Sequence, residues 1–431
     1  MENYKWSMFT YHVSTKKGVI ISNTLNHGVI FLDEKTYNNV LKDKNNYQNE
    51  IKELLEQEFI VPEKTDEKKL FIESLLKEWN ECGFLDLHIL TTTGCNFKCP
   101  YCYQCGINVE TLTEEKMQKA IKFLENYIKK NNIKETRVEI TGGEPTVNWK
   151  IVEKLLPALD KLFNKYGVKY ETLMVTNGLL LTKEKVDLIA QYNWKRLQLT
   201  IDGLEDVHNK RRVNKGKENS FKTIIENLDY IIKNNKIEIV NLRINYDKSN
   251  VEKVPELLEF IKKRYGTEKF QISLGLITKT VKEASANEFI EKYGINENEF
   301  KNYYIKLYKE LINKGFEVSD VFSFDGMCTA KLKHGFLMQP DGKIVKCVSG
   351  VGREEFVIGN YLKNNITEEN YLFLDIYENC LEKNCPFLPL CHTGCRFDAF
   401  IKNGDKKKNS CKRELLEEIN NEIIKIYYKE N

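Results

Sequence analysis

Six segments that read as β-strands alternate with helical segments through the middle of the chain, and this alternation limits the possible fold more than any other feature. Short runs of β-branched and aromatic residues bounded by turn residues indicate the strands, and apolar residues at helical spacing indicate the helices. We predict strands at 85–91, 137–141, 171–176, 196–201, 237–245 and 269–277, and helices at 114–131, 148–164, 182–191, 219–234 and 251–263. The pattern predicts an α/β fold with a partial parallel (β/α)6 barrel, in which functional residues follow the carboxyl ends of the strands.

The segments on either side of this repeat differ in character. Residues 10–32 read as three short strands broken by turns and followed by helices, so we expect a small α+β, winged-helix-like unit. Beyond the barrel we expect a helical connection, then a cysteine-rich segment with turn dipeptides such as Asp325-Gly326, and a closing charged helix at 412–429. The predicted parts are residues 1–81, 82–282, 283–320 and 321–431.

Composition limits the partners and the redox compartment. The 66 Lys and Arg residues nearly balance 63 Asp and Glu residues, so no strong electric field favours a nucleic acid or a membrane surface. No apolar run is long enough to span a bilayer, and the first residues lack the pattern of a secretory signal. We therefore expect a cytoplasmic protein, whose 12 cysteines serve metal or iron-sulfur ligation more readily than disulfides.

Three cysteines follow the first predicted strand of the barrel, at Cys95, Cys99 and Cys102. A [4Fe-4S] cluster has four irons, so three thiolates leave one iron open to a small ligand, whereas a structural zinc site needs a fourth Cys or His. Cys105 could supply that ligand, and a zinc knuckle is the alternative interpretation. The C-x3-C-x2-C spacing at the mouth of a barrel favours the cluster.

This loop resembles the signature of the radical SAM superfamily, C-x3-C-x-aromatic-C, with Tyr101 as the aromatic residue. Further matches follow later strands: Gly142-Gly143-Glu144-Pro145, Thr176-Asn177-Gly178 and Thr200-Ile201-Asp202-Gly203. The resemblance, over about residues 85–280, implies that the open iron binds the amino and carboxylate groups of S-adenosylmethionine (SAM). It also implies that Gly142 to Glu144 hold the amino group and that Tyr101 lies beside the adenine. An electron from the cluster would then cleave SAM, and the deoxyadenosyl radical would take a hydrogen from the substrate.

Other residues near the strand ends are candidates for contacts with SAM or substrate. They are Asn177, Thr200, Asp202, Arg212 and Arg243. Charged residues at such positions are also often merely solvated or salt-bridged, and both interpretations stay open. We expect Cys82 and Cys105 to be ordinary residues.

The C-terminal cysteines resemble a SPASM domain. Cys328, Gly342 and Cys347 match the first part of that pattern, and Cys385, Cys391 and Cys395 match the second. Four residues separate Cys380 from Cys385, where the family pattern has two, which leaves open which of them heads the second group. The resemblance implies two auxiliary [4Fe-4S] clusters, three clusters in all. One would be held by Cys380, Cys385, Cys391 and Cys411, and the other by Cys328, Cys347 and Cys395 with one vacant iron.

Simpler interpretations of these cysteines remain open. A zinc-bearing scaffold and disulfides are alternatives to the clusters. His392, next to Cys391, is a further candidate ligand, although a neighbouring His usually lies on the surface or bonds locally.

SPASM-containing enzymes mostly modify peptides or proteins, and the N-terminal unit looks like a recognition domain that binds the leader of a precursor peptide by strand addition. Its alternative is a simple cap on the barrel. A vacant auxiliary iron suits thioether formation, in which a Cys thiolate held on that iron attacks a carbon radical and the cluster accepts the extra electron. We therefore expect a peptide maturase of the sactipeptide or ranthipeptide type, with an electron donor such as flavodoxin or ferredoxin.

Other functions remain as alternatives. They include carbon-carbon crosslinking, epimerisation or decarboxylation of a peptide, and sulfatase-type oxidation of Cys or Ser to formylglycine. The long segment before Cys95 and the presence of Val348, where sulfatase-maturating enzymes carry an Asp, argue against the last of these. A non-catalytic electron carrier would have no use for the Gly142 to Pro145 and Thr176 to Gly178 matches. A zinc-dependent binding module would be colourless instead of brown.

Overall fold

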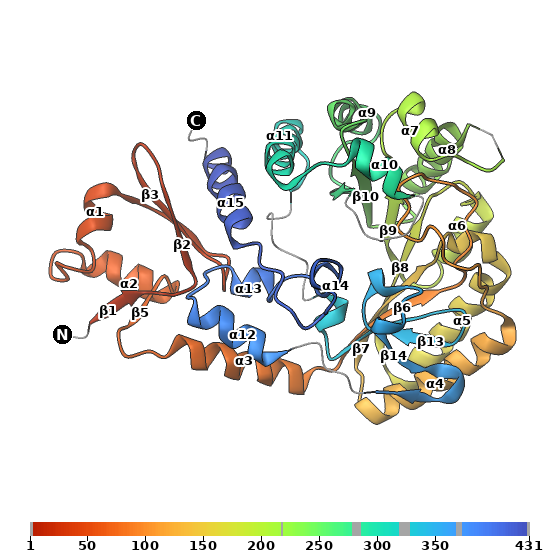
Figure 1. The fold of residues 1–431 in the computed structure, drawn as a ribbon, viewed down its shortest axis with the longest axis horizontal. Coiled ribbons are helices and arrows are strands. Elements are labelled where there is room, and N and C mark those ends of the chain that lie inside the picture. The colour runs from red at the N-terminus through yellow and green to blue at the C-terminus, as the bar shows by residue number, and fades with distance from the viewer. Residues whose placement is uncertain (1–2, 217–218, 278–285, 319–327, 368–372, 429–431) are drawn as a thin grey trace. The chain divides into compact units, whose positions relative to one another are not determined.

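A computed structural model describes residues 3–216, 219–277, 286–318, 328–367 and 373–428 (Figure 1). Its internal contacts divide the chain into two compact units. The barrel unit comprises the described residues of 82–318 and 328–371. The terminal unit comprises those of 1–81 and 372–431, so the two ends of the chain share one unit.

The barrel unit is built on a ten-stranded sheet in the order β11-β10-β9-β8-β7-β6-β12-β13-β14-β15. Six strands are parallel: β6 (Phe84–Leu90), β7 (Glu135–Thr141), β8 (Lys169–Thr176), β9 (Trp194–Thr200), β10 (Ile239–Tyr246) and β11 (Phe270–Leu276). The helices between them are α4 (Glu114–Asn131), α5 (Trp149–Tyr166), α6 (Lys183–Ile189), α7 (Glu205–Arg211), α8 (Ser220–Lys233) and α9 (Val254–Tyr265). The six predicted strands, the five predicted helices and the partial barrel-like sheet are confirmed, whereas α7 was not predicted.

Alternation along the strands separates the hydrophobic core from the polar residues. In β6, Leu85, Leu87 and Ile89 are buried in the same core as the apolar faces of α4 and α5. The residues between them, Asp86 and His88, point to the other face of the sheet because successive side chains in a strand alternate. Both are buried, so that face carries charged groups away from water.

Four further strands extend the sheet beyond β6. They are β12 (His334–Met338), β13 (Lys343–Val345), β14 (Val357–Asn360) and β15 (Asn365–Ile366). β12 pairs in parallel with β6, and the others follow as an antiparallel ribbon. The predicted part at 321–431 is divided between the two compact units. Main-chain pairing joins residues 328–367 to the barrel, and the residues after 372 belong to the terminal unit. The predicted boundaries at 282/283 and 320/321 lie outside the described residues, and the four-part organisation stays a prediction.

The helical connection predicted at 283–320 contains α10 (Ala286–Tyr293) and α11 (Glu297–Lys314) in its described part. A capping box starts α11, in which the Asn296 side chain accepts from the backbone of Glu299 and the Glu299 side chain accepts from the backbone of Asn296. Gly315 closes the helix in the left-handed conformation. These local signals explain why the helix begins and ends where it does.

The terminal unit contains a three-stranded antiparallel sheet of β2 (Thr10–Ser14), β3 (Gly18–Asn23) and β4 (Val29–Asp33). A second pair joins β1 (Tyr4–Trp6) to β5 (Ile60–Pro62), and α1 (Glu34–Asn39), α2 (Gln48–Glu56) and α3 (Glu67–Glu81) complete the N-terminal part. The C-terminal part adds α12 (Leu374–Glu382), α13 (Leu388–Cys391), α14 (Arg396–Asn403) and α15 (Arg413–Tyr427). The predicted short strands and the α+β character are confirmed, and the winged-helix-like recognition role stays a prediction.

One hydrophobic cluster joins the two halves of the terminal unit. Phe9 and Phe71 from the N-terminal part pack with Tyr377 and Leu388 from the C-terminal part. The ring centroids of Tyr11 and Phe387 lie 4.9 Å apart. The two ends of the chain are thus held together by buried apolar contacts.

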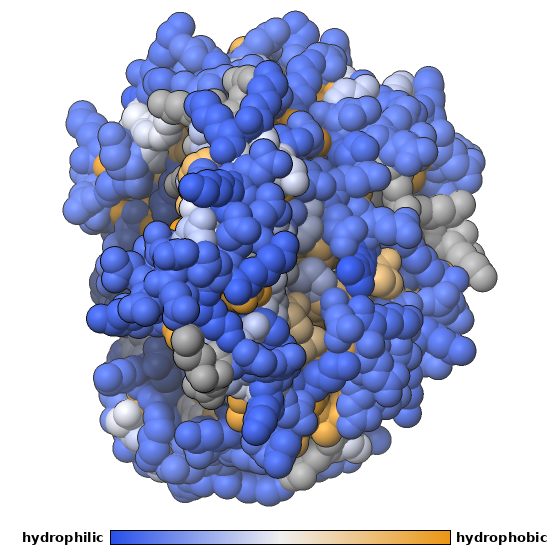
Figure 2. All heavy atoms as spheres, turned by 90° about the vertical axis from the view of Figure 1, so that its left-hand side faces the viewer, coloured by the Kyte–Doolittle hydropathy of each residue, from blue (hydrophilic) through white to orange (hydrophobic). Residues whose placement is uncertain are grey.

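The face shown in Figure 2 is mainly hydrophilic, with hydrophobic side chains in small scattered groups. Among the helices of the described residues, none combines the length and apolar character needed to cross a bilayer.

Candidate functional site

The loop with the three cysteines begins at the carboxyl end of β6 and lies against the loop that follows β7. The backbone N–H of Gly143 donates to the carbonyl of Thr92 at 2.8 Å, and that of Glu144 donates to Gly94 at 2.9 Å. A Cβ atom on Gly142 would lie 2.5 Å from the Thr92 carbonyl oxygen. Glycine is therefore required here, because only a residue without a side chain allows the two backbones to approach so closely.

Glu144 connects this loop to the end of β8. Its carboxylate is fully buried and accepts from the backbone N–H of Thr146 at 3.0 Å and from its hydroxyl. It also accepts from the Thr176 hydroxyl and from the backbone N–H of Asn177, each at 2.7 Å. The carboxylate thus binds the protein itself in this structure, and the expected contact of Glu144 with the amino group of SAM stays a prediction.

The other side of the cysteine loop is held by residues 213–215 and by Asn177. Lys98 and Val213 share a backbone hydrogen bond of 2.8 Å, and Lys215 donates to the Asn96 carbonyl at 3.0 Å. The amide of Asn177 donates to the Asn96 side chain at 2.7 Å and lies 4.0 Å from the Cys95 sulfur. Asn177 is therefore placed beside the cysteines, as the sequence indicated.

The three thiols of the loop form an electrostatically coupled group. Burial raises the pKa of Cys99 to about 11, with Arg212 opposing this shift and Asp202 and the other two thiols adding to it. Burial also raises the pKa of Cys95 and of Cys102. A metal centre binds the thiolate form of Cys, so these three thiols lose their protons when a cluster binds.

The ligand spacing of the loop suits a cluster. In the described ranges, no group of three or more His, Cys, Asp or Glu side chains is arranged to hold a single metal ion. The backbone N–H of Cys105 donates to the Cys102 carbonyl at 3.0 Å, so Cys105 stays the candidate for a fourth ligand in the zinc-knuckle alternative. In a [4Fe-4S] cluster each thiolate binds a different iron, so convergence on one point is not needed.

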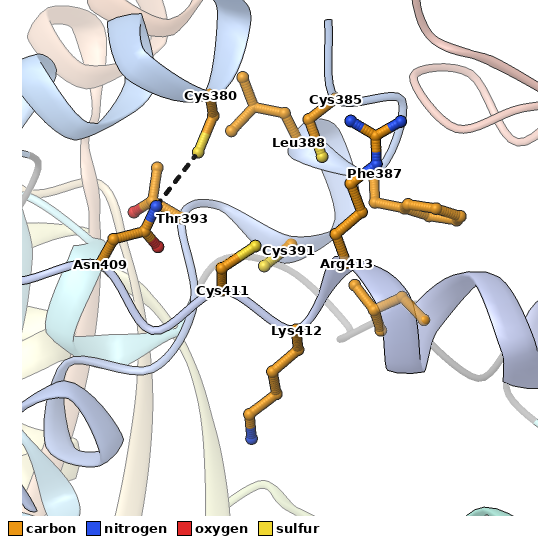
Figure 3. A pocket seen from close by; sticks show the side chains of 11 residues that line it. Cys380, Cys385, Phe387, Leu388, Cys391, Thr393, Asn409, Cys411, Lys412 and Arg413 are labelled. Atoms are coloured by element: carbon orange, nitrogen blue, oxygen red, sulfur yellow. Dashed lines mark hydrogen bonds between the residues drawn. The ribbon is translucent and has the colours of Figure 1, made fainter. Parts of the chain in front are cut away.

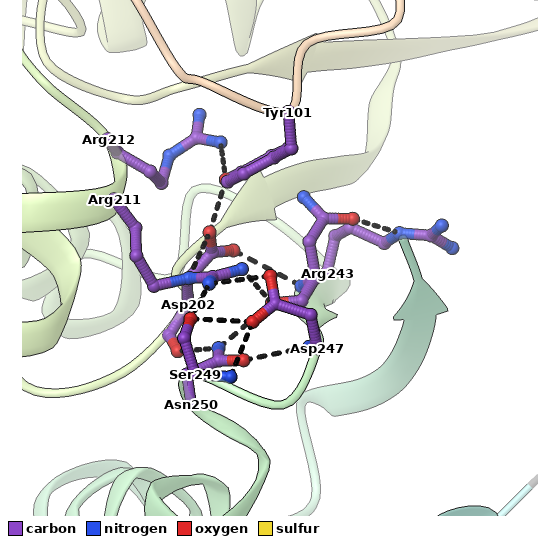
Figure 4. Close-up of polar contacts among 9 residues, drawn as sticks. Tyr101, Asp202, Arg211, Arg212, Arg243, Asp247, Ser249 and Asn250 are labelled. Atoms are coloured by element: carbon purple, nitrogen blue, oxygen red, sulfur yellow. Dashed lines mark hydrogen bonds and ion pairs between the residues drawn. The ribbon is translucent and has the colours of Figure 1, made fainter. Parts of the chain in front are cut away.

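Tyr101 is fixed by a buried polar network at the ends of β9 and β10 (Figure 4). Its hydroxyl donates to Asp202 and accepts from Arg212 at 3.2 Å. Burial, and then the Asp202 carboxylate, hold the pKa of Tyr101 well above its usual range. The structure therefore brings together Tyr101, Asp202 and Arg212, three of the predicted candidates.

Sequence reasoning missed two members of this network, Arg211 and Asp247. The Arg211 guanidinium lies 5.1 Å from the centre of the Tyr101 ring and forms a 2.7 Å ion pair with Asp247. Its Nε also lies 3.4 Å from Asp202. Asp247 lies two positions beyond the end of the predicted strand at 237–245 and directly follows β10, and this position was the signal that could have identified it.

Arg243 and Thr200 lie next to each other in the register of β10 and β9. The Arg243 guanidinium donates to the side chains of Asn245 at 3.1 Å and Ser273 at 2.9 Å. A Cβ atom on Gly275 would lie 2.4 Å from the Arg243 guanidinium. Arg243 therefore lies flat against β11, and its contact with SAM or substrate stays a prediction, as does that of Thr200.

Four C-terminal cysteines line one pocket of the terminal unit (Figure 3). They are Cys380, Cys385, Cys391 and Cys411, the set that the sequence assigned to one auxiliary cluster. The pocket has about 290 Å³ of empty space, part of it open to solvent, and its other lining residues include Phe387, Leu388, Lys412 and Arg413. Four thiols around one space suit a fully ligated cluster, and we call this site the four-cysteine pocket.

The remaining predicted ligands are divided between the units. Cys328 and Cys347 belong to the barrel unit, and Cys395 belongs to the terminal unit, so their joint ligation stays a prediction. His392 lies 3.3 Å from the Tyr377 hydroxyl through Nδ1, which gives its ring a local partner. All 12 cysteines lie in the described ranges, and no disulfide joins any two of them.

Residues 89–261 match the family model of the radical SAM superfamily. The match contains the cysteine loop and strands β7 to β10, whereas most of β6 precedes it and β11 follows it. The chain thus contains a radical SAM domain, a class of domain that uses a [4Fe-4S] cluster and SAM.

Relatives and structural neighbours extend the likeness beyond this domain. The radical SAM cyclopropyl synthase TigE of Paramaledivibacter caminithermalis is 25% identical over 378 residues, which cover 80% of this chain and 75% of TigE. The solved structure of anSMEcpe with bound AdoMet and Cp18Cys peptide superposes with a TM-score of 0.61 at 19% identity, over 80% of this chain and 98% of that one. Streptococcus suis SuiB bound to the precursor peptide SuiA gives a TM-score of 0.55 at 18% identity, over 96% and 99% of the two chains. These two likenesses establish the fold alone.

Proposed function

We propose that this chain is a radical SAM peptide maturase that joins a Cys sulfur of a ribosomally made precursor peptide to a carbon atom of the same peptide. The observation that carries the proposal is the presence of two separate cysteine sites in one chain: the loop after β6 and the four-cysteine pocket. A peptide as substrate is supported by the structural neighbours, since anSMEcpe and SuiB were both solved with a bound peptide.

The cluster residues divide into three groups under this proposal. Cys95, Cys99 and Cys102 would hold the SAM-cleaving cluster. Cys380, Cys385, Cys391 and Cys411 would hold one auxiliary cluster, and Cys328, Cys347 and Cys395 another with an open iron for the substrate thiolate. When bound, SAM and its cluster supply a deoxyadenosyl radical that removes a carbon-bound hydrogen from the substrate.

The chain's own residues would bind and orient SAM. The backbones of Gly142 and Gly143, pressed against Thr92 and Gly94, offer a rigid cradle for its amino group. Tyr101 offers an aromatic wall whose position is set by Asp202 and Arg212. Because these groups are already hydrogen-bonded before SAM arrives, little reorganisation is needed when it binds.

Among the described residues of the terminal unit, the β4 edge of the three-stranded sheet is the candidate surface for a leader peptide. The β2 edge carries Tyr11, whose hydroxyl donates to the Glu417 carbonyl at 3.0 Å and whose ring packs on Phe387. The opposite edge strand, β4, presents Val29 and Phe31 with exposed fractions of 38% and 43%. An exposed strand edge with apolar side chains at alternate positions is the surface that an added peptide strand uses.

The main experiment uses the anaerobically reconstituted protein with SAM, dithionite and a short Cys-rich peptide encoded beside its gene. We expect a loss of two hydrogens per crosslink and protection of the peptide Cys from alkylation. The Cys102→Ala variant should yield neither product nor 5'-deoxyadenosine. Wild-type protein that holds iron but forms no 5'-deoxyadenosine under these conditions would overturn the proposal.

Leader binding is tested separately by fluorescence anisotropy with the labelled peptide. Val29→Ser and Phe31→Ser should weaken binding, because each removes apolar surface from the β4 edge. Lys16→Ser, an exposed change in the β2–β3 turn, is the matched control and should leave affinity unchanged. Equal affinities for all three variants would show that the leader binds elsewhere.

The relationship to TigE favours a second candidate, the formation of a carbon-carbon bond in a peptide. Joining two carbons also removes two hydrogens, so mass alone does not distinguish the candidates. Alkylation does, since the peptide Cys stays reactive after carbon-carbon bond formation and becomes unreactive after thioether formation.

A further inference from the structure

Arg396, at the start of α14, is a fully buried cation close to the four-cysteine pocket. Its side chain is among the largest in the protein with less than 2% exposure. The guanidinium donates to backbone carbonyls of the terminal unit: those of Thr393, Gly394, Lys406 and Lys408. Its Nε has no hydrogen-bond partner.

No carboxylate compensates this charge in the described part of the chain. The nearest acidic residue along the chain, Asp398, accepts a hydrogen bond from Ser410 and lies 3.6 Å from both Lys402 and Lys412. Thr393, whose carbonyl and hydroxyl both accept hydrogen bonds from the Arg396 guanidinium, lines the four-cysteine pocket together with Cys380 and Cys391. A buried cation without an anionic partner is strongly unfavourable, so a negative charge is expected where those thiols lie.

The backbone around Arg396 is also arranged for a cation. His392, Thr393 and Gly394 all have positive φ angles, of 45°, 69° and 81°. A β-branched residue such as Thr393 rarely adopts this conformation, so the turn carries strain. In return, the carbonyls of Thr393 and Gly394 face the guanidinium. The chain therefore holds Arg396 in place at the cost of an unfavourable backbone conformation.

We propose that Arg396 is the counter-ion of the iron-sulfur cluster in the four-cysteine pocket and raises the reduction potential of that cluster. A [4Fe-4S] cluster with four thiolates has a net negative charge that grows on reduction, so a fixed buried cation favours the reduced state. The inference rests on the cluster assignment of the proposed function and adds a residue that sets the electronic property of that cluster.

Two other cations line the pocket and serve as matched controls. The side chains of Lys412 and Arg413 are 43% and 38% exposed, and they pair with Asp398 and Glu417 respectively. Water and salt screen exposed charges, whereas a buried charge keeps most of its effect. Their removal should therefore change the potential less than the removal of Arg396 does.

The experiment isolates this cluster in the full-length chain by changing Cys95, Cys99, Cys102, Cys328 and Cys347 to Ala. The potential of the remaining cluster is measured by redox titration with EPR detection, without SAM or peptide. Arg396→Gln should lower the potential, and Arg396→Lys, which keeps the charge, should restore most of it. Lys412→Gln and Arg413→Gln should cause smaller shifts that shrink further at high salt.

Each other outcome also decides the question. Equal potentials for the Gln and Lys variants of Arg396, or equal loss of iron from both, would show that the residue acts through packing and would overturn the proposal. Loss of iron from the Gln variant alone would support it, because the charge is then needed for assembly. A parent protein with no cluster would also overturn it. Because no substrate is used, failure of the peptide assay would leave this result intact.

Discussion

The Thr176 hydroxyl donates a hydrogen bond to the Glu144 carboxylate across 2.7 Å. This contact joins the loop after β7 to the end of β8 and so links two motifs that are separate in the sequence. The Glu144 carboxylate also accepts a hydrogen bond from the backbone N–H of Asn177, whose side chain lies beside the Cys95 sulfur. The buried Glu144 carboxylate thus connects the Gly142-Gly143 cradle, through Asn177, to the cysteine loop.

Replacing Glu144 with Ala should destabilise the protein by about 2–5 kcal/mol, because several buried donors lose their acceptor. SAM affinity should fall as well, since the cradle and Asn177 lose their common support. Denaturant unfolding and isothermal titration with SAM measure the two effects. Glu153→Ala, at an exposed position on α5, is the control and should change stability by less than about 0.5 kcal/mol. Equal unfolding midpoints would show that Glu144 has no such supporting role.

His88 should make stability depend on pH. Its imidazole lies between Glu139, 2.9 Å from Nδ1, and Asp86, 3.3 Å from Nε2. Burial opposes its charging, but the two carboxylates outweigh burial and raise the pKa of His88 to about 10. The stabilisation from the charged form is therefore complete below about pH 6.5, where the unfolded chain is also protonated, and is lost as the pH rises toward 10.

The stability advantage of the wild type over His88→Gln should accordingly shrink between pH 6.5 and pH 10, by up to about 1.4 kcal/mol per pH unit. Denaturant unfolding across this range measures the change, and an NMR titration of the imidazole measures the pKa directly. A His88 resonance that titrates near pH 6.5 would contradict the expectation.

Gly275→Ala should move Arg243 without removing it. The new Cβ would lie 2.4 Å from the flexible guanidinium, which can swing away, so the fold should survive. If Arg243 contacts SAM or the peptide, binding of that ligand should weaken several-fold. Gly83→Ala is a suitable control, because a Cβ there would make only ordinary contacts of 3.5 Å or more. Unchanged affinity for both ligands would remove Arg243 from the site.

Tyr101→Phe should cost about 1–3 kcal/mol of stability, because buried Asp202 and Arg212 each lose a hydrogen-bond partner. Formation of 5'-deoxyadenosine should slow, since the ring loses its anchor. Tyr103→Phe is the matched control: its hydroxyl accepts from Gln104 at 2.8 Å, and the residue is 42% exposed. Similar losses for the two variants would indicate that the anchor is unimportant.

The sequence by itself determined the local elements, and the chemistry of the cysteines stays its prediction. The six parallel strands follow from apolar runs and turn residues, and the three-cysteine loop from its spacing, because both depend on neighbours along the chain. The resemblance to the SPASM pattern also groups Cys380, Cys385, Cys391 and Cys411 as the ligands of one cluster, and these four residues line one pocket.

Tertiary structure alone decided which distant segments meet and which charges are buried. The pairing of β12 with β6 and the common core of Phe9 and Tyr377 join segments far apart in sequence, and such pairing leaves no local trace. Arg396 reads like any other arginine along the chain, and the motif that contains Glu144 did not indicate that its carboxylate would be fully buried. Their effects arise because packing removes water from around them, and the cost of that removal depends on the partners that folding brings into contact.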